Sequence, residues 1–229
     1  MRTFGSPEFF FIFHALRWTL TLTVIAFVGG GLVGIALAVM RISSSRALRV
    51  ATSAYMQFIQ GLPLLILMFI CYYAPSLFGL EVSAIAAAAV ALTINSSAFL
   101  GAIWESALRA IPKAQWESAD ALALHPYKVL RYVIAPQAIR LAMPSTVGFL
   151  VQIIKQTSIA SIIGFVEITR AGQLVSNATF EPLKSFLAVA AFYFAVCFPL
   201  TQLSLWLESR AAKRGARAVP VSAAYAVEI

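Results

Sequence analysis

The uncharged stretch Trp18–Met40, WTLTLTVIAFVGGGLVGIALAVM, lies between Arg17 and Arg41 and is 23 residues long. A helix needs about 20 apolar residues to cross the hydrocarbon core of a bilayer, so this stretch predicts a membrane-spanning helix. A secretory signal has a shorter apolar region, about 7–15 residues, and a cleavage site. The glycines at positions 29–31 and 34 instead favour close helix packing. We therefore expect a span that is retained.

The composition of the chain agrees with a membrane protein. Of its 229 residues, 61% are hydrophobic and 11% are charged, whereas about 25% of the residues of a soluble domain are charged. A soluble fold of this size could not cover so much apolar surface with its polar residues. This excludes an ordinary soluble domain and makes membrane lipid the expected surroundings.

Four further apolar stretches complete the predicted fold, an all-α membrane protein with about five transmembrane helices. They are Ala54–Tyr73, which we expect to be kinked or broken near Pro63, Val82–Trp104, Leu141–Val166 and Ser185–Leu207. We expect residues 1–13 to form an extracytoplasmic segment, residues 14–210 the transmembrane domain and residues 211–229 a cytoplasmic tail.

Basic residues are concentrated on one face of a five-span arrangement. Of the 17 Lys and Arg residues, 12 lie in the first connection, the third connection and the C-terminal tail. Because cytoplasmic loops carry the excess of basic residues, we expect the N-terminus outside and the C-terminus in the cytoplasm. The formal net charge of +8 then reflects topology, and no nucleic-acid partner is expected.

The third connection, Glu105–Arg140, is a polar segment of 36 residues. Its pattern predicts one helix from Pro112 to about Leu122 and a second from Pro126 to about Ala135, ending before Pro136. Residues 123–125 would form a tight corner between the helices, with His125 as a helix cap or a docking contact. We therefore expect a compact helix pair on the cytoplasmic face.

This helix pair is predicted to present a docking surface. Leu122, Leu124 and Tyr127 would project into the cytosol, and Glu117 and Asp120 would share one side of the first helix. Exposed apolar side chains rimmed by charge are typical of docking surfaces. A solvated loop folded under the bundle is the alternative that the pattern leaves open.

A polar group interrupts the fourth span at Lys155, Gln156, Thr157 and Ser158. A lysine near the centre of a span costs about 2.5–3.5 kcal/mol on insertion scales, so it is expected to face a cavity or a partner unless it reaches the interface. We predict that these residues line a translocation path and that Lys155 attracts a substrate carboxylate. The alternative is a lysine paired with a carboxylate or carbonyls to fix helix packing.

Other polar residues have simpler interpretations. Asn95, Ser96 and Ser97 in the third span are interpreted first as interhelical hydrogen-bonding groups, with Asn95 as a further candidate for the path. His14 and His125 are too far apart in the predicted arrangement to bind one metal ion, and no metal site is expected.

The polar segment also carries a family resemblance. Residues 117–123, ESADALA, followed by APQA at 135–138, resemble the EAA loop of ABC importer permeases. Flanking stretches resemble the polar amino acid subfamily, the relatives of histidine and glutamine permeases. They are TLTL at 19–22, AVMRIS at 38–43, GLPLL at 61–65, NSSAFL at 95–100, IPKAQ at 111–115 and KQTSIASIIG at 155–164. The resemblance runs from about residue 14 to residue 210.

The resemblance implies the type I ABC importer fold and a coupling role for the EAA loop, residues 112–136. In that family the loop is a helix pair that sits in a cleft of a separate cytoplasmic ATPase. The residues that it would place there are Glu117, Ser118, Ala119, Asp120, Ala121, Leu122, Ala123, Leu124, His125 and Pro126. This sequence has no G-x-x-x-x-G-K-[ST] loop, so an ATPase dimer would bind ATP and Mg, and this chain would hold no cofactor and catalyse no reaction.

Two residues of the loop depart from the family pattern. Ala123 stands where the family usually has Gly, and Ser118 stands where it usually has Ala. Glycine adopts a positive φ freely, whereas alanine is strained there. If the corner is left-handed, we expect Leu124 or His125 to adopt that conformation.

Further departures affect polar positions in the spans. The family commonly carries Asp at the position of Gln156, Arg at that of Gln60, and Glu and Arg at those of Ala102 and Glu105. Gln60 and these other positions are candidates for gating or for setting the preferred substrate charge. Because such permeases work as pairs, a chain altered at several of them favours a heterodimer with a second, non-identical permease over a homodimer.

The resemblance predicts the permease subunit of an ATP-binding cassette importer in the bacterial inner (plasma) membrane. It would move polar amino acids delivered by an extracytoplasmic substrate-binding protein. The alternative is a stand-alone secondary transporter or channel, which would need carboxylates or ion ligands at the centres of the spans. An intramembrane hydrolase would need a Ser–His or Asp–Asp pair at mid-depth. The sequence places neither arrangement there.

Overall fold

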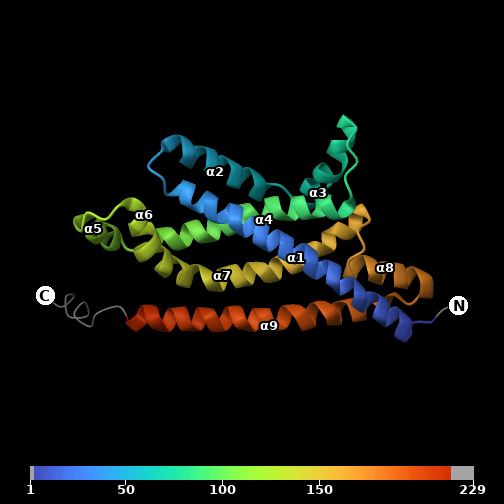
Figure 1. Ribbon diagram of the computed structural model, residues 1–229. Coiled ribbons are helices and arrows are strands. Elements are labelled where there is room, and N and C mark those ends of the chain that lie inside the picture. Colours follow the sequence, from blue (N-terminus) through green and yellow to red (C-terminus); the bar gives the residue numbers. More distant parts are fainter. Residues whose placement is uncertain (1–2, 218–229) are drawn as a thin grey trace.

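The computed structural model describes residues 3–217, with side chains for residues 3–119 and 121–211, and shows a bundle of long helices (Figure 1). The α-helices are α1 (Ser6–Arg41), α2 (Arg46–Gly61), α3 (Leu64–Tyr73), α4 (Ala84–Arg109), α5 (Lys113–Ala121), α6 (Pro126–Lys128), α7 (Ala135–Gln156), α8 (Ile168–Thr179) and α9 (Pro182–Arg217). Ala74–Phe78 and Thr157–Ile163 form 3₁₀ segments, and Val129–Ile134 forms a π-helical segment.

The number of spans agrees with the sequence prediction. Four helical stretches of the described chain are long and apolar enough to cross a membrane, namely Ser6–Arg41, Ala84–Arg109, Pro126–Ile163 and Pro182–Ala211. The pair formed by α2 and residues 64–78 counts as a fifth span, bent by 99° at its break. The predicted fold of about five transmembrane helices is therefore confirmed.

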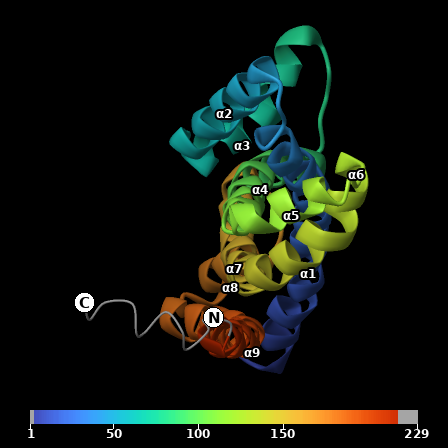
Figure 2. The ribbon, with the colours of Figure 1, turned by 90° about the vertical axis from the view of Figure 1, so that its left-hand side faces the viewer.

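The break in the second span lies at Leu62 and Pro63, as predicted. Both residues have extended backbone, with ψ of 131°. Proline has no N–H to donate within a helix and disfavours helical backbone at the preceding residue. As a result α3 turns away from α2, and the two helices flank the bundle on the side opposite α9 (Figure 2).

The first span packs very closely against the third. A Cβ added at Gly30 would lie 2.5 Å from Cβ of Ser96, and one added at Gly34 would lie 2.9 Å from the backbone nitrogen of Gly101. No larger residue fits at either position without moving α1 away from α4. The predicted role of this glycine cluster in close helix packing is confirmed.

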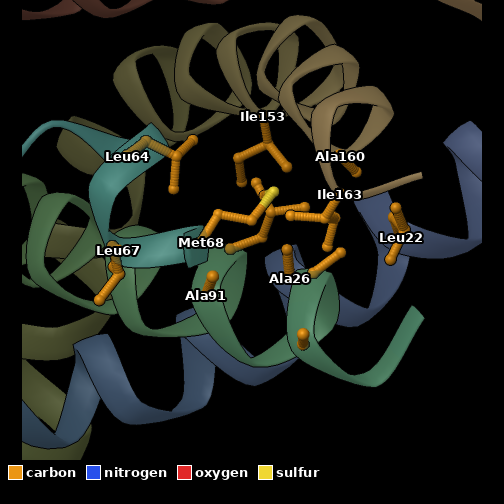
Figure 3. Packing of buried hydrophobic residues seen from close by; sticks show 12 residues of the cluster. Leu22, Ala26, Leu64, Leu67, Met68, Ala91, Ile153, Ala160 and Ile163 are labelled. Carbon is orange, nitrogen blue, oxygen red and sulfur yellow. The ribbon is translucent and has the colours of Figure 1, made fainter. Parts of the chain in front are cut away.

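The largest apolar cluster among the described residues joins four spans (Figure 3). Its members come from α1, α3, α4, α7 and the 3₁₀ segment that follows α7. They are Leu22, Ala26, Leu64, Leu67, Met68, Ala87, Ala88, Ala91, Leu92, Ile153, Ala160 and Ile163. This packing fixes the 3₁₀ segment after Gln156 against three other spans.

The polar third connection forms a helix pair, but its second helix does not end where the sequence predicts. Helix α5 covers nearly the predicted range, whereas α6 continues through the π-helical segment directly into α7. Pro136 is the second residue of α7 and has no N–H to donate to the turn before it. The wide π-helical turn just before it lets the chain pass the proline without stopping, so the predicted end before Pro136 is wrong.

The corner after α5 is left-handed at Ala123, where φ is 51°. The N–H of Leu124 donates to the carbonyl of Ala119 over 3.3 Å. This is the hydrogen bond of a Schellman motif, in which the residue directly before the donor is left-handed. The expectation that Leu124 or His125 would take this conformation is therefore wrong. Ala123 takes it at a cost of about 1–2 kcal/mol.

The connections rich in basic residues lie at one end of the bundle. The α1–α2 turn, the α5–α6 pair and the C-terminal end of α9 lie toward the same end, whereas the start of α1, α8 and the α3–α4 connection lie toward the other end (Figure 1). The α5–α6 pair faces the viewer in Figure 2. This grouping matches the two faces expected from the distribution of charge.

Two neighbouring glycine substitutions test the contact between α1 and α4. We expect Gly30→Ala to destabilise the fold by about 1–3 kcal/mol, because its Cβ overlaps Ser96. Gly31→Ala places its Cβ no closer than 4.0 Å to Leu100, and alanine favours a helix by about 1 kcal/mol over glycine, so this variant should be neutral or stabilised. Thermal unfolding of both purified variants in detergent measures the difference, and equal melting temperatures would contradict the close contact.

Candidate functional site

The α5–α6 pair is anchored to the bundle by a second apolar cluster. Ile111 and Ala119 are buried there with Leu108 of α4 and with Val129 and Ile134 of the π-helical segment. The pair is therefore packed against the ends of two spans and is not a solvated loop. The cluster thus links the pair to residues of α4 and α7.

The outer surface of the pair presents two of the three predicted apolar side chains. Leu122 is 73% exposed and Tyr127 is 57% exposed. Leu124 is partly buried and packs against the second cluster, so the prediction that it projects into solvent is wrong. The corner folds back on α5, as the hydrogen bond from Leu124 to Ala119 shows, and this turns the Leu124 side chain inward.

The charged and polar residues of the pair are only partly described. Glu117 and Ser118 are exposed on α5, and the side chain of Asp120 lies outside the part of the chain that the structure describes. Nδ1 of His125 accepts a hydrogen bond from the backbone N–H of Tyr127 over 3.4 Å. This places His125 as the predicted cap of α6.

The polar group at the end of α7 divides into an exposed and a buried part. Lys155 is exposed, and no described side chain forms a hydrogen bond or an ion pair with it, so the predicted alternative of a lysine paired within the chain is not observed. Thr157 is buried, and its hydroxyl donates to the carbonyl of Ile154 over 2.8 Å. The hydroxyl of Ser158 donates to the carbonyl of Lys155 over 2.7 Å. Lys155 is thus the exposed member of this group.

Helix α4 connects the other predicted path residues. Nδ2 of Asn95 donates to Oε1 of Gln156 over 3.4 Å, and Nε2 of Gln60 donates to the carbonyl of Ala98 over 3.1 Å. The hydroxyls of Ser97 and Tyr55 lie 2.8 Å apart. Asn95 and Gln156 are therefore brought together across α4 and α7, while Gln60 binds α4 one turn away.

The predicted interhelical hydrogen bonds form at Asn95 and Ser97 but not at Ser96. The Ser96 hydroxyl is buried and has no hydrogen-bonding partner among the described residues. Its Cβ faces Gly30, so Ser96 serves close packing between α1 and α4. A small side chain is what this position requires.

A buried carboxylate that the sequence did not single out links α8 and α9. Glu167 caps α8 and is fully buried. Its carboxylate accepts from the N–H groups of Thr169 over 2.9 Å and Arg170 over 2.8 Å, and from the hydroxyl of Tyr193 over 3.0 Å. Burial raises the pKa of the Glu167 carboxyl above its ordinary value, although these hydrogen bonds act in the opposite direction. A polar side chain directly before a helix is typical of an N-cap, so the sequence carried a signal for the capping role of Glu167 but none for its burial.

Thr19 extends the same network to α1. Its hydroxyl accepts from the backbone N–H of Ile168 over 3.3 Å. The network therefore holds the segment between the 3₁₀ turn and α8 to two spans. This segment follows directly after the predicted path residues, so its position is fixed from both sides.

A second carboxylate fixes the opposite end of the bundle. Glu105 accepts from Nε of Arg41 over 2.9 Å and from Nε of Arg109 over 2.8 Å. Arg109 also donates to the carbonyl of Arg41 over 3.2 Å. These bonds tie the end of α1 to the end of α4, next to the α5–α6 pair. The negative charge of Glu105, a residue that departs from the family pattern, is thus neutralised by Arg41 and Arg109.

No metal centre accompanies these groups among the described residues. The histidine, cysteine, aspartate and glutamate side chains in that part of the chain form no group of three or more that could hold a metal ion. The groups available for binding are therefore the exposed ammonium group of Lys155, the amides of Asn95 and Gln156, and the protruding α5–α6 pair.

Removing one hydroxyl tests the buried network around Glu167. We expect Tyr193→Phe to destabilise the fold by about 1–3 kcal/mol, because the buried carboxylate loses the hydrogen bond from the Tyr193 hydroxyl. Tyr73→Phe is the matched control, since that ring is 56% exposed. Differential scanning fluorimetry in detergent gives both melting temperatures, and an unchanged value for Tyr193→Phe would show that the hydrogen bond contributes nothing.

Comparisons with known proteins agree on one family. The model of the family described as "Binding-protein-dependent transport system inner membrane component" matches residues 30–213. A putative glutamine transport system permease protein of Rickettsia conorii is 32% identical over 205 residues, which cover 89% of this chain and 94% of that relative. A probable amino-acid ABC transporter permease protein of Bacillus subtilis is 30% identical over 190 residues, or 83% of this chain and 84% of the relative.

A solved structure shares the fold over nearly the same range. The crystal structure of an amino acid ABC transporter superposes with a TM-score of 0.81 at 32% identity and covers 87% of this chain and 94% of that chain. This chain therefore belongs to the inner membrane components of binding-protein-dependent transport systems, the permease subunits of ABC importers.

Proposed function

We propose that this chain is the membrane-spanning subunit through which an ATP-driven importer moves polar amino acids. The observation that carries the proposal is the ordered α5–α6 pair, which protrudes at the basic end of a bundle that belongs to the importer permeases. The names of two relatives, an amino-acid permease and a glutamine permease, support amino acids as the substrate class. ATP is hydrolysed by a separate subunit in this family.

The α5–α6 pair is the part of the chain suited to receive force from that ATPase. Leu122 and Tyr127 are the apolar side chains that it offers to a cleft, with Glu117 exposed beside them. Ala119 and Val129 carry a displacement inward, because both are buried against the ends of α4 and α7. ATP-driven closure of an ATPase dimer would therefore move two spans that line the proposed path.

The polar group at the end of α7 is the proposed gate and substrate contact. Lys155 offers an unpaired ammonium group to the carboxylate of an amino acid, and Asn95 and Gln156 offer amides nearby. The 3₁₀ segment that follows is packed against α1, α3 and α4, so a tilt of α7 changes its position relative to these spans. Such a tilt would open or close the path.

A stand-alone transporter is not supported by the placement of carboxylates. Within the described spans they lie near the ends, at Glu8, Glu105 and Glu208. Glu105 is already neutralised by Arg41 and Arg109. No carboxylate at mid-depth in these spans is available to couple transport to protons or sodium, whereas an ATPase partner supplies the energy in this family.

The proposal also includes orientation and partners. With the basic end in the cytoplasm, the α5–α6 pair meets the ATPase, the N-terminus lies outside, and an extracytoplasmic binding protein delivers substrate at the α8 end. The polar departures at Gln60, Ala102, Glu105 and Gln156 favour a second, non-identical permease. Such a partner would supply the charged groups that this chain lacks at these positions.

Affinity purification of the tagged chain tests both the docking role of the α5–α6 pair and the proposed partners. We expect Leu122→Asp to lower the amount of bound ATPase roughly 30-fold, because a charge replaces a central apolar contact worth about 2 kcal/mol or more. Leu77→Asp is the matched control, since Leu77 is 83% exposed at the other end of the bundle. Mass spectrometry of the unaltered complex should reveal a second permease sequence.

Two outcomes of that purification would count against the proposal. Full retention of the ATPase by Leu122→Asp would remove the docking role of the α5–α6 pair. A complex that contains this chain as its sole permease would contradict the heterodimer while leaving the docking role intact.

Uptake of radiolabelled amino acids by cells tests the role of Lys155. We expect Lys155→Met to lower uptake at least about tenfold, because a charge-assisted hydrogen bond to a carboxylate is worth about 1.5–3 kcal/mol. Lys155→Arg keeps the charge and should retain more uptake than Lys155→Met. Unchanged uptake by Lys155→Met, at normal expression and assembly with the ATPase, would eliminate the substrate contact.

A further inference from the structure

A groove runs between the end of α1 and the α6–α7 continuation, on the flank of the bundle. It has a volume of about 390 Å³ and is lined mainly by apolar side chains. Its apolar wall includes Ile35, Val39, Trp104, Leu108, Leu130 and Ile139. The groove does not overlap the proposed path residues near Lys155.

The depth of the groove follows from its position along α1. Ile35 and Val39 precede Arg41, the last residue of the first span, so the groove lies where the span leaves the hydrocarbon core. Ile35, Val39 and Ile139 are also exposed on the outer surface of the chain. Apolar side chains exposed at this depth face acyl chains. The groove thus opens toward one leaflet, at the same end as the α5–α6 pair.

One charged side chain, Arg131, lines the groove together with Tyr127. Its Nη1 donates to the hydroxyl of Tyr127 over 2.6 Å. The guanidinium carbon lies 5.9 Å from the ring centroid of Tyr127 and 5.7 Å from that of Tyr132. The two tyrosines hold the guanidinium group in place, and no carboxylate among the described residues neutralises it.

We propose that this groove is a binding site for an anionic phospholipid. One acyl chain lies along Ile35, Val39 and Ile139, and the phosphate binds the guanidinium group of Arg131. A rigid guanidinium fork suits phosphate oxygens, and Tyr and Trp side chains are typical of the level at which headgroups lie. The charge of Arg131 selects an anionic lipid over a zwitterionic one.

The bound lipid has a structural consequence for the α5–α6 pair. It bridges α1 to the π-helical segment, which shares the second apolar cluster with α5. The lipid therefore supports the position of the helix pair relative to the first span. This inference concerns binding alone and does not depend on which substrate the chain transports.

Quenching of Trp104 fluorescence by brominated lipids tests the site. The full chain, purified with its native partner subunits, is placed in nanodiscs that contain brominated phosphatidylglycerol or brominated phosphatidylcholine. The contribution of Trp104 is obtained by subtracting the signal of Trp104→Phe, because Trp104 lines the groove. We expect phosphatidylglycerol to quench Trp104 at a lower mole fraction than phosphatidylcholine does.

Two variants separate the groove from general surface charge. Arg131→Gln should reduce the preference for phosphatidylglycerol about tenfold, the equivalent of about 1.5 kcal/mol, because the phosphate loses a charge-assisted hydrogen bond. Arg140→Gln removes an exposed basic residue of α7 that does not line the groove, and should leave the preference unchanged. In the unaltered complex, added salt should also weaken the preference, which provides a readout that needs no substitution.

Three outcomes would overturn the proposal. Equal quenching by the two lipids, unaffected by salt, would show that the site does not select anionic lipid. Absence of quenching by either lipid would show that another membrane subunit fills the groove. An equal effect of Arg131→Gln and Arg140→Gln would assign the preference to general surface charge.

Discussion

The hydrocarbon core offers no water to backbone N–H and C=O groups, and this constraint determines the architecture of the chain. Each apolar stretch must satisfy its own backbone bonds as a helix, and polar segments must lie at the ends of the bundle. Just before the break at Leu62 and Pro63, Gln60 donates to the carbonyl of Ala98, so the break lies next to α4. Tight helix contacts, as at Gly30 and Ser96, then replace the hydrophobic effect as the source of cohesion between spans.

The same constraint makes the α5–α6 pair a separate mechanical part. It is too polar to enter lipid, yet Ala119 and Ile111 bury it against the ends of α4 and α7. The π-helical segment joins it to α7 without a break, so α6 and the fourth span form one continuous helical element. Glu105 holds the neighbouring ends of α1 and α4 together, and the Glu167 network holds the opposite end.

The sequence predicted the features that depend on local pattern. The spans follow from the lengths of the uncharged stretches, the break follows from Pro63, and the cap at His125 follows from the corner before Pro126. The sequence did not predict the features that depend on how distant segments pack. Leu124 turns inward because the corner folds back on Ala119, and Ala123 is left-handed because the helix ending requires it there. Glu167 is buried because α8 and α9 enclose it, which no local pattern reveals. The roles of Lys155, Gln156, Gln60 and Asn95 remain proposals, since they depend on a substrate and a second permease.

The most direct measurement of the central claim is thiol labelling from the two sides of the membrane. Cys71 and Cys197 are replaced, and single cysteines are introduced at Leu122 and at Leu77. With a membrane-impermeant maleimide, we expect Leu77→Cys to be labelled in intact cells. Leu122→Cys should be labelled only in inverted vesicles, and only after the ATPase is stripped from them. Labelling of Leu122→Cys in intact cells would place the α5–α6 pair on the outer face and contradict its role as the part moved by the ATPase.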